Sequence, residues 1–141
     1  MRSRLRVALI AHDGRKQDLL AWVRWNKVSL ARFDLCATRH TGELVAEATG
    51  LPVRLLLSGE MGGDAQVAAM IAYQEIDLVL FFWDPLATQP HTADVRSLVR
   101  LAVLHDVPIA CNRRTADLLI SSPLLAEMRR AVAEASLQRS A

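Results

Sequence analysis

Five short apolar runs, separated by segments with helical spacing, constrain the fold of this 141-residue chain more than any other feature. Each run has about the length of a strand and is mostly apolar on both faces, which is typical of strands buried in a parallel sheet. The runs lie at residues 7–11, 33–37, 53–57, 78–82 and 108–111.

The segments between the runs predict amphipathic helices. Their apolar residues recur at helical spacing, as in Leu19, Leu20 and Val23; Leu44, Val45 and Ala48; Val67, Ala68 and Ile71; and Val95, Leu98, Val99 and Ala102. Alternating strands and helices predict an α/β fold, with helices wound on both faces of a five-stranded parallel sheet. We expect one domain over residues 1–141, with a helical tail from about residue 123.

Composition argues against several classes of partner. The 17 basic and 15 acidic residues give a net charge of +2 without a long basic run, so nucleic acid is not expected as a partner. The apolar run before His12 is too short for a signal-peptide core or a membrane span, which predicts a cytoplasmic protein without a membrane partner. Cys36 and Cys111 lack CxxC spacing, which predicts reduced thiols and no zinc site.

Polar residues follow every predicted strand. Ligands of such folds bind outside the carboxyl ends of the strands, where these side chains would meet along one edge. Carboxylates, imidazoles and a lysine gathered at that edge predict a small-molecule site. The residues, in strand order, are His12 and Asp13; Thr38, Arg39, His40 and Thr41; Ser58, Gly59 and Asp64; Asp84; and Asn112.

The glycine-containing stretch SGEMGGDAQV, residues 58–67, narrows the kind of ligand. It is too short and wrongly spaced for a Walker motif, and the chain has no GxGxxG, so neither a nucleoside triphosphate nor a dinucleotide is favoured. A small phosphorylated ligand remains, bound by Lys16, by a threonine-rich turn and by amides near Ser58. Carboxylates and His91 would face its other end, which suggests proton abstraction next to a carbonyl.

Each of these residues also has a purely structural interpretation. Asp64 could be an N-cap that follows a glycine turn, and Lys16 could be an ordinary solvated lysine. Thr38 and Thr41 could be a strand end and a helix cap, although a threonine turn entering a helix is also suited to phosphate.

The segment 84–91 has two prolines and no hydrophobic periodicity, so its default interpretation is a surface loop. His91 and Asp94 would share one face if the next helix has already begun there. Both would then lie close to Asp84, the carboxylate after the fourth predicted strand.

Four blocks of sequence strongly resemble the methylglyoxal synthase family. They are AHDGRKQ at 11–17, LSGEMGGDAQV at 57–67, FFWDPLATQPHTADV at 81–95 and PIACN at 108–112. The resemblance runs from about residue 7 to residue 123, with the blocks in the family's order. It implies a flavodoxin-like domain and a lyase that converts dihydroxyacetone phosphate to methylglyoxal and inorganic phosphate without metal or organic cofactor. It further implies a homohexamer under allosteric inhibition by phosphate.

The resemblance also implies roles for individual residues. Asp64 matches the catalytic carboxylate, His91 the imidazole at the substrate carbonyl, and Asp84 and Asp94 the supporting carboxylates. The residues that match substrate and phosphate contacts are His12, Asp13, Lys16, Thr38, Thr41, Ser58 and Gly59.

The chain departs from the family pattern in two loops. The family usually has ATGTTG after the second strand, whereas this chain has ATRHTG at 37–42, with Arg39 for a glycine and His40 for a threonine. Arg39 would either add a contact to phosphate or clash if that glycine needs a positive φ. No family role is carried onto His40, and Glu60 replaces a common proline.

Two alternative functions stay open on the sequence alone. The same fold serves as the regulatory domain of carbamoyl phosphate synthetase and as the cyclohydrolase half of a purine-synthesis enzyme, so a phosphate- or nucleotide-sensing domain without catalysis is one alternative. The other is a family member that lost activity through Arg39 and His40. A binding module would not need Asp64, Asp84 and His91 together with Asp94, which favours the enzyme.

Overall fold

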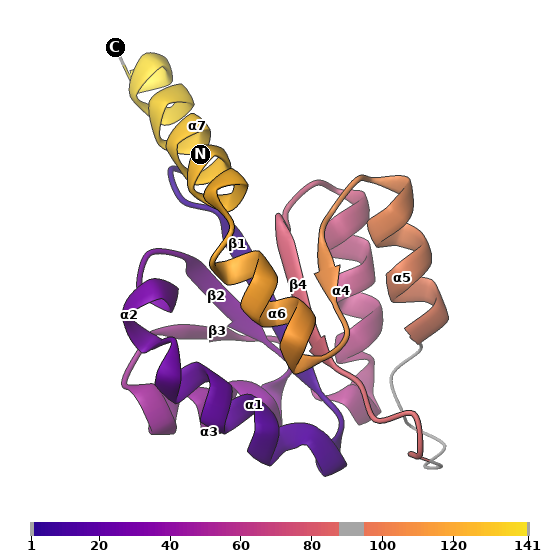
Figure 1. Ribbon diagram of the computed structural model, residues 1–141. Helices are drawn as coiled ribbons and strands as arrows, with labels where there is room; N and C mark the ends of the chain where they lie inside the picture. Colours follow the sequence, from indigo (N-terminus) through magenta and orange to yellow (C-terminus); the bar gives the residue numbers. More distant parts are fainter. Residues whose placement is uncertain (1, 88–94, 141) are drawn as a thin grey trace.

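The predicted fold class is confirmed by a computed structural model, which describes residues 2–87 and 95–140. Five strands form one parallel sheet in the order β3-β2-β1-β4-β5 (Figure 1). The strands are β1 (Arg6–Ala11), β2 (Asp34–Ala37), β3 (Val53–Leu55), β4 (Leu78–Phe82) and β5 (Ile109–Ala110).

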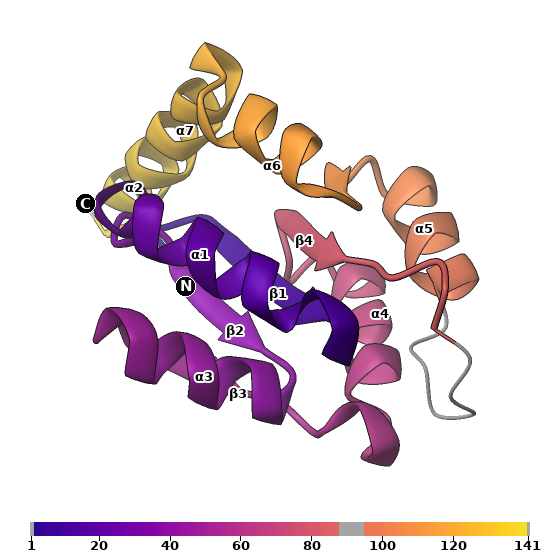
Figure 2. The same cartoon turned by 60° about the horizontal axis from the view of Figure 1, so that its bottom comes forward.

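Helices cover both faces of this sheet. Figure 2 shows α4 and α5 together on one side, and α1, α3 and α6 on the other. The helices are α1 (Lys16–Trp25), α2 (Lys27–Leu30), α3 (Arg39–Thr49), α4 (Gly63–Ala72), α5 (Val95–Leu104), α6 (Arg113–Ile120) and α7 (Pro123–Ser140), with short 3-10 turns η1 (Asp13–Arg15) and η2 (Gly59–Met61).

The central strand β1 shows why the strands appear in the sequence as continuous apolar runs. Val7 and Leu9 pack into the core under α1 and α3, while Ala8 and Ile10 pack into a second core under α4 and α5. Because successive side chains of a strand point to opposite faces, a sheet covered on both faces needs apolar residues at every position. These two buried layers fix the strands whose loops form the site.

The structure differs from the sequence-based expectation at the sheet edges and in the connections. Strand β3 ends at Leu55 rather than at residue 57, and β5 has only two residues. The short helices α2 and α6 were not predicted. Helix α6 is tied to α1 by a hydrogen bond from the buried Trp22 Nε1 to the Asp117 carboxylate, at 2.7 Å. Such long-range pairing leaves little trace in local periodicity.

The tail expected after residue 123 is helix α7, which extends away from the sheet and its covering helices (Figure 1). Only Leu125 of this helix is buried, whereas Leu124 and Leu137 are exposed. Within the described part of the chain, no helix has the length and apolarity needed to cross a membrane.

Candidate functional site

The order of the strands creates a crevice beside β1. The chain passes from β1 to β2 and β3 on one side, then returns to place β4 and β5 on the other. The loops after β1 and β4 therefore turn toward opposite faces, and ligands of open α/β sheets bind at such a switch point. A cleft of about 900 Å³ lies there, lined by the loops that follow β1, β2, β3 and β4.

The structure brings the sequence-predicted site residues together in this cleft. Two of them, His91 and Asp94, lie outside the described residues. Every other residue to which the family resemblance gave a role lines the cleft: His12, Asp13, Lys16, Thr38, Thr41, Ser58, Gly59, Asp64 and Asp84. The roles assigned to them stay predictions.

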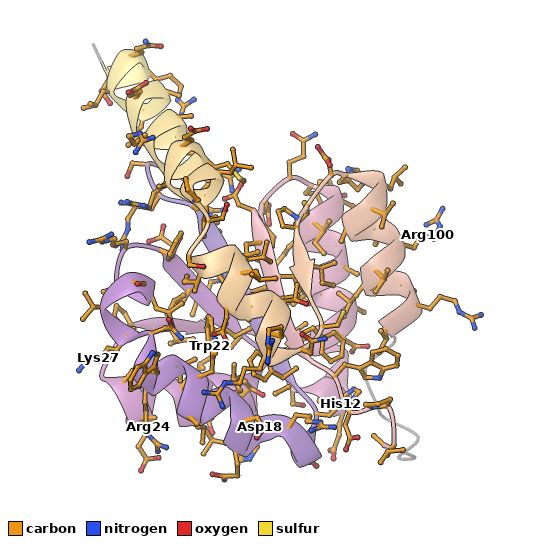
Figure 3. All side chains as sticks on the ribbon, in the orientation of Figure 1. His12, Asp18, Trp22, Arg24, Lys27 and Arg100 are labelled. Carbon is orange, nitrogen blue, oxygen red and sulfur yellow. The ribbon has the colours of Figure 1, made fainter. Side chains whose placement is uncertain are left out.

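His12 is held in one orientation at the carboxyl end of β1 (Figure 3). The Asp84 backbone N–H donates a hydrogen bond to its Nδ1 at 2.9 Å, so the proton of the neutral ring lies on Nε2. The ring meets Phe81 edge-on, with centroids 5.1 Å apart. The imidazole is buried, and its Nε2 has no hydrogen-bond partner among the described residues. His12, which lines the cleft, thus carries one buried N–H donor without a partner among the described residues.

Burial lowers the pKa of His12 from its ordinary value of 6.5, and the folded state consequently binds a proton at His12 less readily than the unfolded chain does. As the pH falls through about 6.5, the unfolded chain is protonated first and the wild type loses stability. The Oδ1 of an asparagine at this position can still accept the Asp84 N–H, but the side chain does not titrate. We therefore expect His12→Asn to lose less stability than the wild type as the pH falls. Urea unfolding of both proteins between about pH 8 and pH 5 checks this; parallel pH profiles would contradict it.

Lys16 is not the solvated lysine that the structural interpretation allowed. As the first residue of α1 it has a side chain only 14% exposed, and its Nζ donates to the Asp13 carboxylate and, at 3.5 Å, to the Ala11 carbonyl. Turn η1 places Asp13 one turn before Lys16, which makes this pairing possible. The lysine is therefore fixed at the edge of the cleft.

The amino end of α3 is suited to an anion. Thr38 occupies the N-cap position, yet its hydroxyl does not cap the helix, which corrects the simple capping interpretation. Thr38 and Thr41 are buried. The Arg39 N–H donates a hydrogen bond to the Leu57 carbonyl at 3.4 Å. The amides of His40 and Thr41 also lie in the first turn, where a helix provides no carbonyl to accept their hydrogen bonds. Free amides at a helix amino end bind phosphate well.

The glycines of the third loop turn the chain sharply into α4. Gly62 has a φ of 95°, a left-handed conformation that L side chains rarely adopt, and it takes the N-cap position. A Cβ on Gly63 would lie 2.0 Å from the Leu57 carbonyl oxygen. Asp64 is therefore not the N-cap that one interpretation suggested. It is the second residue of α4, where the helix dipole stabilises a carboxylate.

Asp84 connects the loops after β1 and β4. Besides donating its N–H to His12, it accepts the Leu86 N–H on its Oδ1 at 3.0 Å. Its other oxygen, Oδ2, would lie 2.4 Å from a Cβ added to Gly14, so a side chain at this position would displace the Asp84 carboxylate. Gly14 was missed by the sequence analysis, as was its neighbour Gln17, which also lines the cleft. Their place inside the AHDGRKQ block was the available signal.

Two residues departing from the family pattern lie differently with respect to the cleft. Arg39 is helical, not left-handed, and its guanidinium lies 3.9 Å from the exposed Glu43 carboxylate, outside the cleft. The structure therefore supports neither the predicted phosphate contact nor the predicted clash. His40, in contrast, lines the cleft.

The fifth predicted strand end does not join the cleft. Asn112 caps α6 by accepting the Thr115 N–H on its side-chain oxygen at 2.9 Å, and it lines a separate hollow with Trp83 and Arg114. The expectation that all five strand ends share one site was wrong for this residue. Over the described ranges, no three His, Cys, Asp or Glu side chains are grouped so that they could hold a metal ion.

The chain is similar to known proteins over most of its length. The family model described as the MGS-like domain matches residues 18–111. The methylglyoxal synthase of Leptospira interrogans is 54% identical over 118 residues, covering 84% of this chain and 80% of that protein. That of Clostridium acetobutylicum is 49% identical over 127 residues, covering 90% and 88%. A crystal structure of methylglyoxal synthase from Elizabethkingia anophelis matches with a TM-score of 0.83 at 44% identity, covering 89% of this chain and 82% of that one.

Proposed function

This chain belongs to the methylglyoxal synthase family, and from that membership we propose that it is a lyase converting dihydroxyacetone phosphate to methylglyoxal and inorganic phosphate. One observation supports this most: a single cleft is lined by a carboxylate, Asp64, by the imidazole of His12, and by the anion-binding amino end of α3. Together these groups suit a small phosphorylated carbonyl compound.

The phosphate group of the substrate would bind at the amino end of α3. The first-turn amides there carry the positive end of the helix dipole, and Lys16 brings a cation to the same cleft. The hydroxyls of the buried residues Thr38 and Thr41, which line the same cleft, would add donors beside them. This arrangement would direct the carbonyl end of the substrate toward Asp64 and Asp84.

The first chemical step is removal of a proton from the carbon of the CH2OH group, next to the carbonyl. We assign this step to the Asp64 carboxylate, which must lie within about 3 Å of the CH2OH carbon when substrate is bound. The electrons move onto the carbonyl oxygen and form an enediolate, whose charge needs a hydrogen-bond donor. We assign that donor to His91 and place His12 among the substrate contacts.

The second step breaks the bond between carbon and the phosphate oxygen. The enediolate hydroxyl gives up its proton and its oxygen becomes the aldehyde carbonyl. At the same time the carbon–carbon double bond moves to the CH2 carbon, and phosphate leaves with the electron pair of the broken bond. The resulting enol takes up a proton at its CH2 carbon and becomes methylglyoxal. Phosphate can leave only if its carbon–oxygen bond overlaps the enediolate π system, so we infer that the contacts at α3 hold this bond out of the enediolate plane.

Further properties follow from the same proposal. Inorganic phosphate, as the product, would compete for the amino end of α3 and inhibit the enzyme. Residues 1–141 would form one domain, working in the cytoplasm as a homo-oligomer, with a hexamer as the expected assembly. Asp84 and Asp94 would support the acid–base chemistry of Asp64, without metal or organic cofactor.

The experiment that tests the function is methylglyoxal formation from dihydroxyacetone phosphate by the purified protein in the presence of EDTA. Enzymatic production that persists in EDTA is the expected result. A protein that releases no methylglyoxal but binds inorganic phosphate in calorimetry would overturn the proposal and support the phosphate-sensing alternative.

A further inference from the structure

We propose that His40 is a phosphate-binding residue of this chain, which strengthens its affinity for the phosphate end of the substrate. The proposal deepens the proposed function and rests on it for the identity of the substrate. His40 is the second residue of α3, between the predicted phosphate contacts Thr38 and Thr41, and it lines the same cleft. Its side chain therefore borders the cleft beside the helix end that suits an anion.

Among the residues that the structure describes, the imidazole of His40 has no partner that would compete with a ligand. Its side chain is exposed, and it makes no hydrogen bond or ion pair with residues 2–87 and 95–140. Glu43, the nearest acid along α3, pairs instead with Arg39, at 3.9 Å. A histidine that is neither packed nor paired is free to meet a ligand.

The chemistry of imidazole fits a phosphate at this position. A histidine ring carries at least one N–H in each of its ordinary protonation states, so it can donate to a phosphate oxygen whether it is neutral or charged. The neighbouring amides of His40 and Thr41 point out of the same helix end, where the dipole favours negative charge. One ligand oxygen could therefore be bound by the helix end while His40 binds another.

Arg39 provides a matched control, because it is the adjacent residue, is also basic in type, and lies outside the cleft. Removing its side chain alters the exposed surface of α3 without removing a cleft donor. A general effect of charge or helix stability would then appear in both variants, whereas loss of a direct contact would appear only at His40.

The test compares wild type with His40→Ala, His40→Gln and Arg39→Gln in two measurements. Calorimetry gives Kd for inorganic phosphate, and steady-state assays give KM and kcat for dihydroxyacetone phosphate. For His40→Ala we expect both Kd and KM to rise about tenfold or more, the loss of one hydrogen bond to a charged group, with kcat changed much less. His40→Gln keeps an N–H donor and should recover most of the affinity. Arg39→Gln should stay within about twofold of wild type.

The outcomes separate this proposal from the proposed function. Unchanged Kd and KM in His40→Ala would overturn the role of His40, even if the wild type makes methylglyoxal. Equal losses in His40→Ala and Arg39→Gln would also overturn it, since they would indicate a general charge effect. If the wild type makes no methylglyoxal, yet phosphate binding weakens only in His40→Ala, the role of His40 is supported and the proposed function fails.

Discussion

Replacing Asp64 by Asn is expected to lower kcat/KM for methylglyoxal formation by a factor of roughly 10²–10⁴, the usual contribution of a general base. Asparagine keeps the size of the side chain in the first turn of α4 but cannot accept the substrate proton. The end of the cleft proposed to bind phosphate is built by α3 and Lys16, so binding of inorganic phosphate should persist. The variant should therefore still bind inorganic phosphate but form little methylglyoxal.

Asp18→Asn is the matched control for this loss. Asp18 is also an aspartate in the first turn of a helix, but it is exposed, lies outside the cleft and forms a surface ion pair with Arg15, at 3.4 Å. Surface ion pairs contribute little to stability, so the activity of Asp18→Asn should stay close to that of the wild type. Activity in Asp64→Asn within about threefold of the Asp18→Asn control would refute the assignment of the base.

Replacing Gly63 by Ala is expected to lower the free energy of unfolding by roughly 1–3 kcal/mol or more, the cost of overpacking a close contact. The added Cβ would lie 2.0 Å from the Leu57 carbonyl oxygen, and backbone atoms cannot rotate away as a flexible side chain can. The turn must open to relieve this overlap. Because Asp64 is the next residue, the variant should also lose activity beyond what its stability explains.

Gly59→Ala in the same loop is the control for the stability measurement. A Cβ on Gly59 would meet no atom within 4 Å, and its φ does not lie in the left-handed region. Urea unfolding followed by circular dichroism should show the Gly59→Ala protein close to the wild type and the Gly63→Ala protein clearly weaker. Equal stability of the two variants would show that the loop tolerates a side chain at Gly63.

Much of the fold was predictable because a doubly covered parallel sheet imposes a strong local pattern. Each buried strand must be apolar on both faces, and each covering helix must carry an apolar stripe. The predictions were weakest where that constraint weakens, at the edge strands β3 and β5 and at the short helix α6. Helix α6 has only eight residues, of which only Ala116 is buried, so the segment offers few buried positions from which a helix could be predicted.

The sequence by itself determined the five strand segments, the polar loops that follow them and the family to which they correspond, since these depend on local composition and order. Only the tertiary structure decided which loops meet. The strand order places β1 between β2 and β4, so that His12 bonds to Asp84 across 72 residues of sequence while Asn112 falls outside the cleft. Which loops meet depends on how all the strands and helices pack together, and local sequence patterns do not contain this information.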